Sequence, residues 1–317
     1  MTAASVPEGA FISGEVGRRP RRAIRRFVRG QPLGVFGLVL IAFFLCVAAF
    51  APFLARYSPT ASGAPLLQSP GSTYWFGTDS LGRDVFSRIV VGSQISLVIA
   101  FSVVTINIAL SSLLGLVSGY FGGWPDYLIQ RSGEAAHAFP GLILYFLVIS
   151  AFGRPSTEGG NLLSIAWDLR ALILALSLPA FFGGSRILRA AALSLKQTDF
   201  VLGARAVGAN DWRIIMSHLL PNVAPLILVQ ASSAVGGIIL AESSLSFLGL
   251  GVPPGTPSWG ADLAGRNRTF FVEAPWLALA PGLAISFTVL GFNLFGDALR
   301  DVLDPRMRGR SRRSRRG

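Results

Sequence analysis

The sequence is poor in charge, in lysine and in cysteine. Of its 317 residues, 14% are charged and 51% are hydrophobic, and the mean hydropathy is +0.56. A soluble protein needs more charge on its surface to remain in water, so this composition argues against a soluble fold for the whole chain.

The scarce residues also argue against several kinds of active site. The single cysteine, Cys46, cannot form a disulfide within the chain, and His137 and His218 lack the paired spacing of a metal site. The sole lysine, Lys196, is followed by Gln197, whereas a nucleotide-binding P-loop needs lysine followed by serine or threonine. We therefore expect no catalytic residue, no metal and no cofactor bound by this chain.

What the sequence does have is long apolar stretches. About 20 apolar residues cross the hydrocarbon of a bilayer. Six stretches lack aspartate, glutamate, lysine and arginine, and all but the fourth are close to this length or longer: residues 30–55, 89–125, 135–153, 171–185, 214–241 and 274–296. The sequence therefore predicts an all-α integral membrane protein with six transmembrane helices.

Two of these stretches differ from the ideal length. The second ends in a glycine-rich turn, so its helix is expected at about residues 92–118. The fourth is short, and snorkelling of Arg170 and Arg186 at its ends extends it to about 20 residues. The uncharged residues 57–78 and 243–261 are rich in proline, glycine and serine, which predicts loops.

The basic residues predict the orientation. With a cytoplasmic N-terminus, most of the 28 lysine and arginine residues fall on the cytoplasmic side, as the positive-inside rule requires. This gives an arginine-rich cytoplasmic tail at residues 1–29, a six-span region at 30–305 and a basic cytoplasmic tail at 306–317. Such tails could bind nucleic acid, but beside membrane spans they are explained as orientation signals that touch anionic lipid. We expect membrane lipid as a partner and no nucleic acid.

The loop between the fourth and fifth spans has the pattern of two short helices around a glycine. Asp199 can cap the first helix, Gly208 permits a tight reversal, and Asn210 or Asp211 can cap the second. Pro221 marks the entry into the next span. Taken alone, this pattern is also compatible with an ordinary helical connection.

This loop resembles the EAA loop of the permease subunits of binding-protein-dependent ABC importers. The family pattern is Glu-Ala-Ala, three residues, Gly, nine residues, Ile, one residue and Leu-Pro. Counting from Gly208 places Leu202-Gly203-Ala204 at the first triplet and Leu220-Pro221 at the end. Leu202, Gly203 and His218 depart from the pattern, and the missing glutamate removes one specific polar contact.

Three further stretches resemble one branch of that family, the dipeptide, oligopeptide and nickel permeases, and specifically the second of their two permease subunits. They are Phe76 to Arg88 after the first span, Leu245 to Gly260 after the fifth, and Gly296 to Arg306 at the end of the sixth. Together with the EAA-like loop they stand in the family's order and spacing, so the resemblance extends from about residue 30 to 308.

The resemblance implies a type I ABC importer permease in a bacterial cytoplasmic (inner) membrane. The implied partners are a second, homologous permease, one or two ATPases that bind ATP and Mg, and an extracytoplasmic substrate-binding protein. The coupling segment, residues 199–220 within a loop at 190–221, would dock an ATPase. The residues expected to couple to the ATPase are Asp199, Leu202, Gly203, Ala204, Arg205, Gly208, Ala209, Asp211, Arg213, His218 and Pro221.

Polar residues inside spans are candidates for the translocation path. They are costly in lipid and therefore face a neighbouring helix or water. Helix-to-helix hydrogen bonding remains the alternative for Asn107, Gln230, Thr288 and Asn293. Glu242, at the outer end of the fifth span, either lines the outer mouth or caps the next loop. Glu134 and His137 near the inner end of the third span are explained by solvation at the interface.

The charged residues after the first span have two interpretations. Asp79, Arg83, Asp84 and Arg88 lie close enough in sequence to form surface ion pairs on a short helix. Alternatively, they contact the substrate-binding protein.

Three other functions are alternatives to a peptide importer. A nickel-chelate or other small-solute importer shares the same permease motifs. An ion-coupled secondary carrier needs acidic residues within the membrane, whereas those of this chain lie near the ends of the predicted spans. An intramembrane enzyme needs a catalytic pair at membrane depth, and no motif for one is present.

Overall fold

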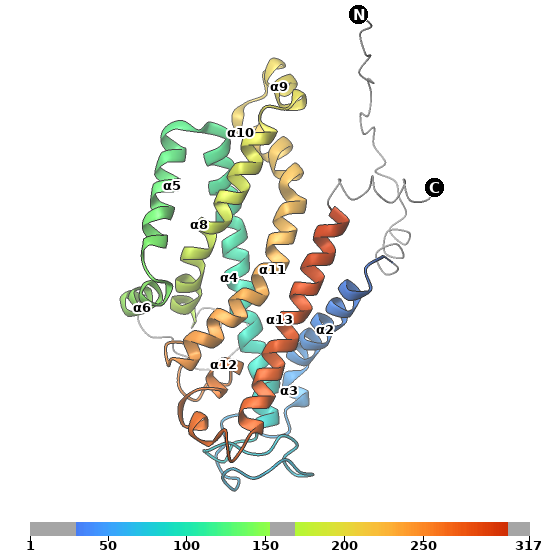
Figure 1. Ribbon diagram of the computed structural model, residues 1–317, viewed down its shortest axis with the longest axis vertical. Coiled ribbons are helices and arrows are strands. Elements are labelled where there is room, and N and C mark those ends of the chain that lie inside the picture. Colours follow the sequence, from blue (N-terminus) through green and yellow to red (C-terminus); the bar gives the residue numbers. More distant parts are fainter. Residues whose placement is uncertain (1–29, 153–168, 304–317) are drawn as a thin grey trace, which may run out of the picture.

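The computed structural model describes residues 30–152 and 169–303, which form a helical bundle (Figure 1). The predicted tails at 1–29 and 306–317 lie outside the described residues. Five described segments are long and apolar enough to span a membrane, and a bent helix pair supplies a sixth if it is counted as one span. The five are α2 (Pro32–Ala49), α4 (Val85–Phe121), α8 (Arg170–Leu195), Asp211–Phe247 and α13 (Trp276–Leu303). The predicted all-α membrane fold is confirmed.

Two predicted spans are longer than expected. Helix α4 begins at Val85 because the carboxylate of Asp84 accepts a hydrogen bond from the backbone N–H of Ser87, and it ends where Gly122 adopts a φ of +65°. Helix α8 continues past its predicted end to Leu195. It tolerates Arg189 because this guanidinium binds the carboxylate of Asp126 at 2.5 Å.

The third span is not the single helix predicted at 135–153. Helix α5 (Gly123–Ala138) and helix α6 (Gly141–Phe152) meet at an angle of 99°. Pro140 has no N–H to continue the helix, and the preceding Phe139 is extended with ψ of 135°, as a residue before proline prefers. In Figure 1, α5 runs beside α8, and α6 turns away from the direction of α5 at the edge of the bundle.

The fifth span is built from three consecutive helical pieces. These are α10 (Asp211–Ile214), the π-helix η1 (Ile215–Leu219) and α11 (Leu220–Phe247). The wide π-turn lies immediately before Pro221, which lacks the N–H that an α-helix would use. Because α11 reaches Phe247, the start of the predicted loop at 243–261 is helical instead.

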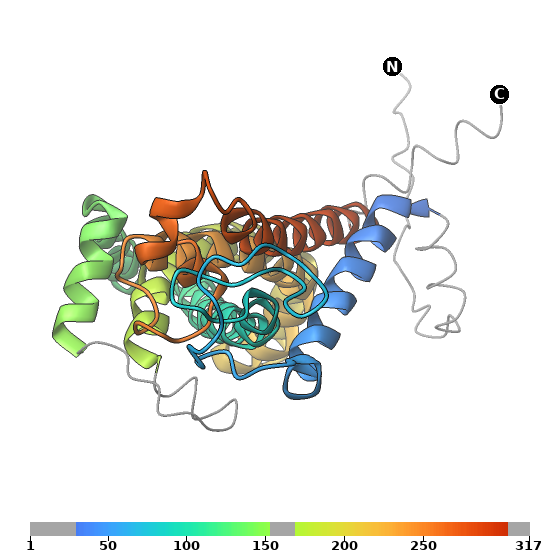
Figure 2. The ribbon, with the colours of Figure 1, turned by 90° about the horizontal axis from the view of Figure 1, so that it is seen from below.

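Small residues let the spans approach closely. A Cβ atom at Gly115 of α4 would lie 2.7 Å from the carbonyl oxygen of Ser185 in α8, and one at Gly37 of α2 would lie 2.6 Å from the carbonyl oxygen of Gly291 in α13. Close backbone approach of this kind is how helices associate in lipid, where no hydrophobic force drives them together. Buried side chains of α2, α4, α8, α11 and α13 contribute to the main hydrophobic core. In the view from below, α2 lies along one edge of the bundle (Figure 2).

The short elements gather at the two ends of the bundle (Figure 1). One end carries α3 (Ala51–Leu54), α12 (Trp259–Asp262) and the 3-10 helix η2 (Gly265–Phe270). The other end carries α9 (Asp199–Ala206) and α10. We refer to these as the outer end and the inner end, following the topology predicted from the sequence.

Candidate functional site

The coupling segment forms the predicted pair of short helices at the inner end. Between α9 and α10, Gly208 adopts a φ of +82°, a conformation that side-chain-bearing residues rarely adopt. The side-chain oxygen of Asn210 accepts a hydrogen bond from the backbone N–H of Arg213 at 2.8 Å, so Asn210 caps α10 as predicted. Asp199 does not cap α9, because the capping position is taken by Thr198 and Asp199 lies in the first turn.

A hydrophobic cluster fixes this segment to the spans. Val201 of α9 and Ile214 of α10 are fully buried, together with Leu219 of the π-helix. They pack against Tyr120 at the end of α4 and Leu188 of α8. The coupling segment is therefore attached to two spans.

The coupling segment also exposes large apolar side chains, beside exposed charged residues such as Arg205 and Arg213. The large exposed side chains are Phe200, Leu202, Val207, Trp212 and Met216, of which Val207 is 85% exposed and Trp212 is 54% exposed. A soluble monomer rarely exposes such a set on one short segment, and aromatic side chains of this kind dominate protein interfaces. The arrangement is suited to binding another protein.

The structure brings the predicted coupling residues to this end but exposes them to different degrees. Three are half-buried: Ala204, Ala209 and His218. The other eight are exposed: Asp199, Leu202, Gly203, Arg205, Gly208, Asp211, Arg213 and Pro221.

Two contacts of Tyr120 connect the segment to the end of α4, and a third contact lies within the segment; the sequence predicted none of them. The hydroxyl of Tyr120 donates a hydrogen bond to Asp211 at 2.5 Å, and the guanidinium of Arg205 lies 5.2 Å from the centre of the Tyr120 ring. The ring of Phe200 lies 6.4 Å from that of His218 in the π-helix. Tyr120 precedes Asp211 by 91 positions, so no local pattern could reveal the pair.

A hollow of about 460 Å³ opens beside α9. Its walls are the end of α4, the end of α8 and α9. The lining residues are Tyr120, Phe121, Lys196, Gln197, Leu202 and Arg205. The hollow adjoins the exposed apolar side chains and can receive a side chain of a docked protein.

At the outer end, the four charged residues form a buried turn rather than a surface helix. Asp79 accepts hydrogen bonds from the backbone N–H groups of Leu81 and Arg83 and pairs with the Arg83 guanidinium at 2.6 Å. Asp84 caps α4. Asp79, Asp84 and Arg88 are each no more than 3% exposed.

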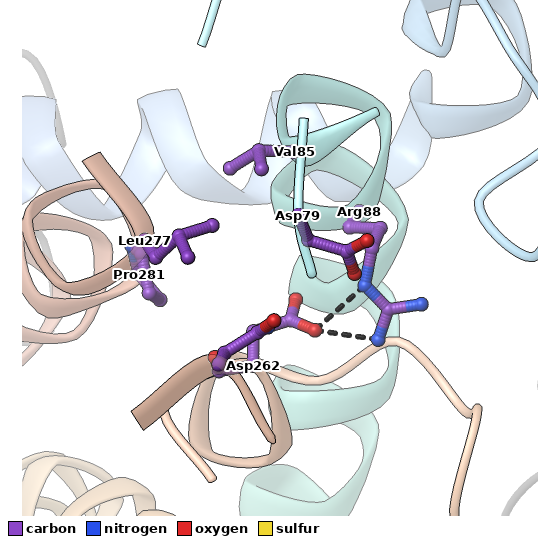
Figure 3. A pocket seen from close by; sticks show the side chains of 7 residues that line it. Asp79, Val85, Arg88, Asp262, Leu277 and Pro281 are labelled. Atoms are coloured by element: carbon purple, nitrogen blue, oxygen red, sulfur yellow. Dashed lines mark hydrogen bonds and ion pairs between the residues drawn. The ribbon is translucent and has the colours of Figure 1, made fainter. Parts of the chain in front are cut away.

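Arg88 joins three outer segments. Its guanidinium binds the carboxylate of Asp262 in α12 at 2.5 Å, as the dashed lines in Figure 3 show, and it donates to the carbonyl oxygens of Pro59 and Gly255. Burial raises the pKa of the Asp262 carboxyl, and the neighbouring Arg88 opposes this increase. The cavity beside the pair measures about 10 Å³, close to the volume that a single water needs. It is too small for a substrate.

This burial corrects both earlier interpretations of the outer residues. Asp79, Asp84 and Arg88 cannot form solvent-exposed ion pairs, and their side chains cannot directly contact a binding protein in this conformation. Even Arg83 is only 12% exposed. The four residues instead hold the loops of the outer end together.

The candidate path residues differ in exposure and in their hydrogen-bond partners. Thr288 is fully buried and donates to the carbonyl oxygen of Ala284 in its own helix. Glu242 is 1% exposed and accepts hydrogen bonds from Ser246 and Ser258, so it holds the loop after α11 and does not line an outer mouth.

The other three path candidates lie on different helix surfaces. Asn107 is half-buried on α4 beside α8, and Asn293 of α13 is exposed next to Gly236 of α11. The amide nitrogen of Gln230 is buried and has no hydrogen-bond partner among the described residues.

Two family models match the chain. Residues 111–309 match the model described as "Binding-protein-dependent transport system inner membrane component", and residues 20–70 match the "N-terminal TM domain of oligopeptide transport permease C". The first match alone covers more than half of the chain and includes the coupling segment.

Curated relatives agree with these models over nearly the full length. A dipeptide transport system permease protein of Alkalihalophilus pseudofirmus is 39% identical over 91% of each chain. Glutathione transport system permease proteins of Pectobacterium atrosepticum and Escherichia coli are 39% and 40% identical over 90% and 92% of each chain. The chain therefore belongs to the family of binding-protein-dependent transport system inner membrane components, in its permease C branch.

Proposed function

We propose that the chain is the second permease subunit of an ATP-driven importer of dipeptides and oligopeptides. Relatives of the same length are named for dipeptide, glutathione and peptide transport, which supports a peptide as the substrate. The observation that carries the proposal is the coupling segment, whose buried side is attached to α4 and α8 while its apolar side is exposed.

In this proposal, the exposed side of the coupling segment docks into a groove of a partner ATPase. Closure of two ATPases on ATP and Mg pulls the segment as a rigid body, because Val201, Ile214 and Leu219 anchor it in the hydrophobic cluster. Tyr120 and Asp211 transmit this movement to the end of α4. The chain itself binds no nucleotide and catalyses no reaction.

The complete transporter contains further subunits. The proposed partners are a homologous second permease, one or two ATPases and an extracytoplasmic binding protein that delivers the peptide. Membrane lipid surrounds the spans, both termini are cytoplasmic, and no nucleic acid is bound. The outer turn of Asp79, Arg83, Asp84 and Arg88 supports this delivery by holding the outer loops in a fixed arrangement.

Affinity purification in mild detergent tests the proposal. We expect the tagged chain to recover a second permease and one or two ATPases. A homogeneous complex of this chain alone would contradict the importer and favour an ion-coupled carrier. Tight binding of a peptide by the co-purified or co-encoded binding protein supports a peptide substrate, whereas binding of a nickel chelate in its place would identify the alternative importer.

A further inference from the structure

The exposed charge of the outer end is mostly positive. Within residues 50–88 and 242–276, Glu273 is the only exposed acidic residue, and the other acidic residues are buried: Asp79, Asp84, Glu242 and Asp262. Arg83 and Arg88 pair with two of the buried carboxylates. The other arginines in these ranges are exposed: Arg56, Arg266 and Arg268. The positive-inside rule does not account for them, because it concentrates basic residues on the cytoplasmic side.

Two of the exposed arginines lie on the 3-10 helix η2, on either side of the buried Asn267. The side-chain oxygen of Asn267 accepts hydrogen bonds from the backbone N–H and the hydroxyl of Ser80, at 3.2 Å and 2.7 Å. Its amide nitrogen donates to the carbonyl oxygen of Asp262 at 3.1 Å. Asn267 therefore ties η2 both to the outer turn and to α12, and it fixes the position of Arg266 and Arg268 in the loop that joins α12 to α13 at the outer end (Figure 1).

Each of these two guanidinium groups lies near an aromatic ring. The guanidinium carbon of Arg266 is 6.0 Å from the centre of the Phe270 ring, and that of Arg268 is 5.4 Å from the centre of the Phe247 ring. Within the part of the chain that the structure describes, neither guanidinium donates a hydrogen bond or pairs with a carboxylate. A guanidinium beside a ring is attracted to it and can still bind a carboxylate through two parallel hydrogen bonds. The N–H groups of both arginines are therefore available to another molecule.

We propose that Arg266 and Arg268 of η2 form a docking site for acidic side chains of the extracytoplasmic substrate-binding protein. The site rests on the proposed function, which supplies this partner and its side of the membrane. The family model that matches the chain is itself described as binding-protein-dependent. Docking at η2 takes the place of a contact at the outer turn, whose charges are buried.

The charges of the outer end favour an acidic protein over lipid as the partner. Anionic lipid attracts basic segments chiefly at the cytoplasmic surface of a membrane, which is the opposite side in the predicted topology. An exposed positive surface steers a protein of opposite charge and speeds its association, and this effect weakens as salt is added. The proposal therefore predicts a salt-dependent association rate that falls when the arginines of η2 are neutralised.

Association kinetics test the site. The complex is immobilised in phosphatidylcholine nanodiscs, and the purified co-encoded binding protein is passed over it at low and at high salt. We expect the double variant Arg266→Gln, Arg268→Gln to lower the association rate constant roughly tenfold at low salt. The difference should nearly disappear at about 1 M salt, where the screening length is about 3 Å. Because both side chains are exposed, the unfolding temperature and the yield of co-purified ATPase should be unchanged.

Arg56→Gln is the matched control. It removes another exposed arginine of the outer end, which lies on a different loop against the ring of Trp75, and should lower the rate constant by no more than about twofold. An equal decrease in this control would indicate steering by the whole outer surface and would overturn the assignment to η2.

Two further outcomes would contradict the site. Wild-type association of the double variant would overturn it, and if that variant instead loses a thermal stabilisation that phosphatidylglycerol gives the unaltered complex, the arginines bind lipid. In both cases the unaltered complex still binds the binding protein, so the importer stands. If the unaltered complex does not bind it at all, the proposed function fails together with the site.

Discussion

The outer turn of Asp79, Arg83, Asp84 and Arg88 buries its charges, whereas the coupling segment exposes large apolar side chains. Arg88 is 3% exposed and is bound by Asp262, while Val207 is 85% exposed and touches no packed neighbour that would cover it. Buried polar groups need partners within the chain, and exposed apolar groups gain most from a partner outside it. The outer end is completed by its own loops, whereas the exposed apolar side chains of the inner end are suited to the partner protein proposed above.

The largest effect is expected from breaking the buried outer pair. Arg88→Ala leaves the Asp262 carboxylate buried without its cation, which destabilises a protein by about 3–5 kcal/mol. We expect a marked decrease in the thermal unfolding temperature of the purified complex. The matched control is Arg131→Ala, which breaks an exposed ion pair and should cost no more than about 1 kcal/mol. Similar unfolding temperatures for the two variants would show that the buried pair at the outer end stabilises the protein no more than an exposed ion pair does.

The next largest effect is expected from substituting Gly208, where the chain reverses between α9 and α10. Gly208→Ala meets no atom within 4 Å, so its cost comes only from the positive φ and amounts to about 1–2 kcal/mol. We expect the coupling segment to lose its shape and the yield of co-purified ATPase to decrease, with membrane insertion unchanged.

Gly203→Ala is the matched control for stability. It also meets no atom within 4 Å, but Gly203 lies in α9 with an ordinary helical φ, so the added methyl group is tolerated. An ATPase yield in Gly208→Ala equal to that of the unaltered chain would contradict the role of the reversal.

The same contrast explains which features the sequence could predict. Local signals predicted the inner end, because a positive-φ glycine and the Asn210 cap act within a few residues. Pro140 signalled the break in the third span, but the hydropathy of the flanking residues obscured it. The pairing of Arg88 with Asp262 joins residues 174 positions apart, so it depends on how the helices pack. A charge pattern in one segment could not distinguish a buried turn from a surface helix.

A smaller effect is expected from removing the cap of α10. Asn210→Ala leaves the backbone N–H of Arg213 without its acceptor, which costs about 1 kcal/mol. Hydrogen exchange of the amides in residues 211–214 should become faster while exchange in α4 is unchanged. Asn210→Asp retains a capping oxygen and should preserve slow exchange. Equal exchange in the alanine and aspartate variants would show that the cap does not hold the coupling segment.

The smallest effect on stability, and the sharpest test of the comparison, is expected at Val207. Val207→Ser changes a side chain that is 85% exposed, so the free energy of unfolding should change by no more than about 0.5 kcal/mol. If an ATPase covers this surface, the same change removes apolar area from the interface and lowers the yield of co-purified ATPase. Leu66→Ser, at an exposed apolar position of the outer loop, is the control and should not affect that yield. An ATPase yield that stays the same in Val207→Ser would mean that the apolar face of the coupling segment is not the docking surface, and the inner end would then need a different partner.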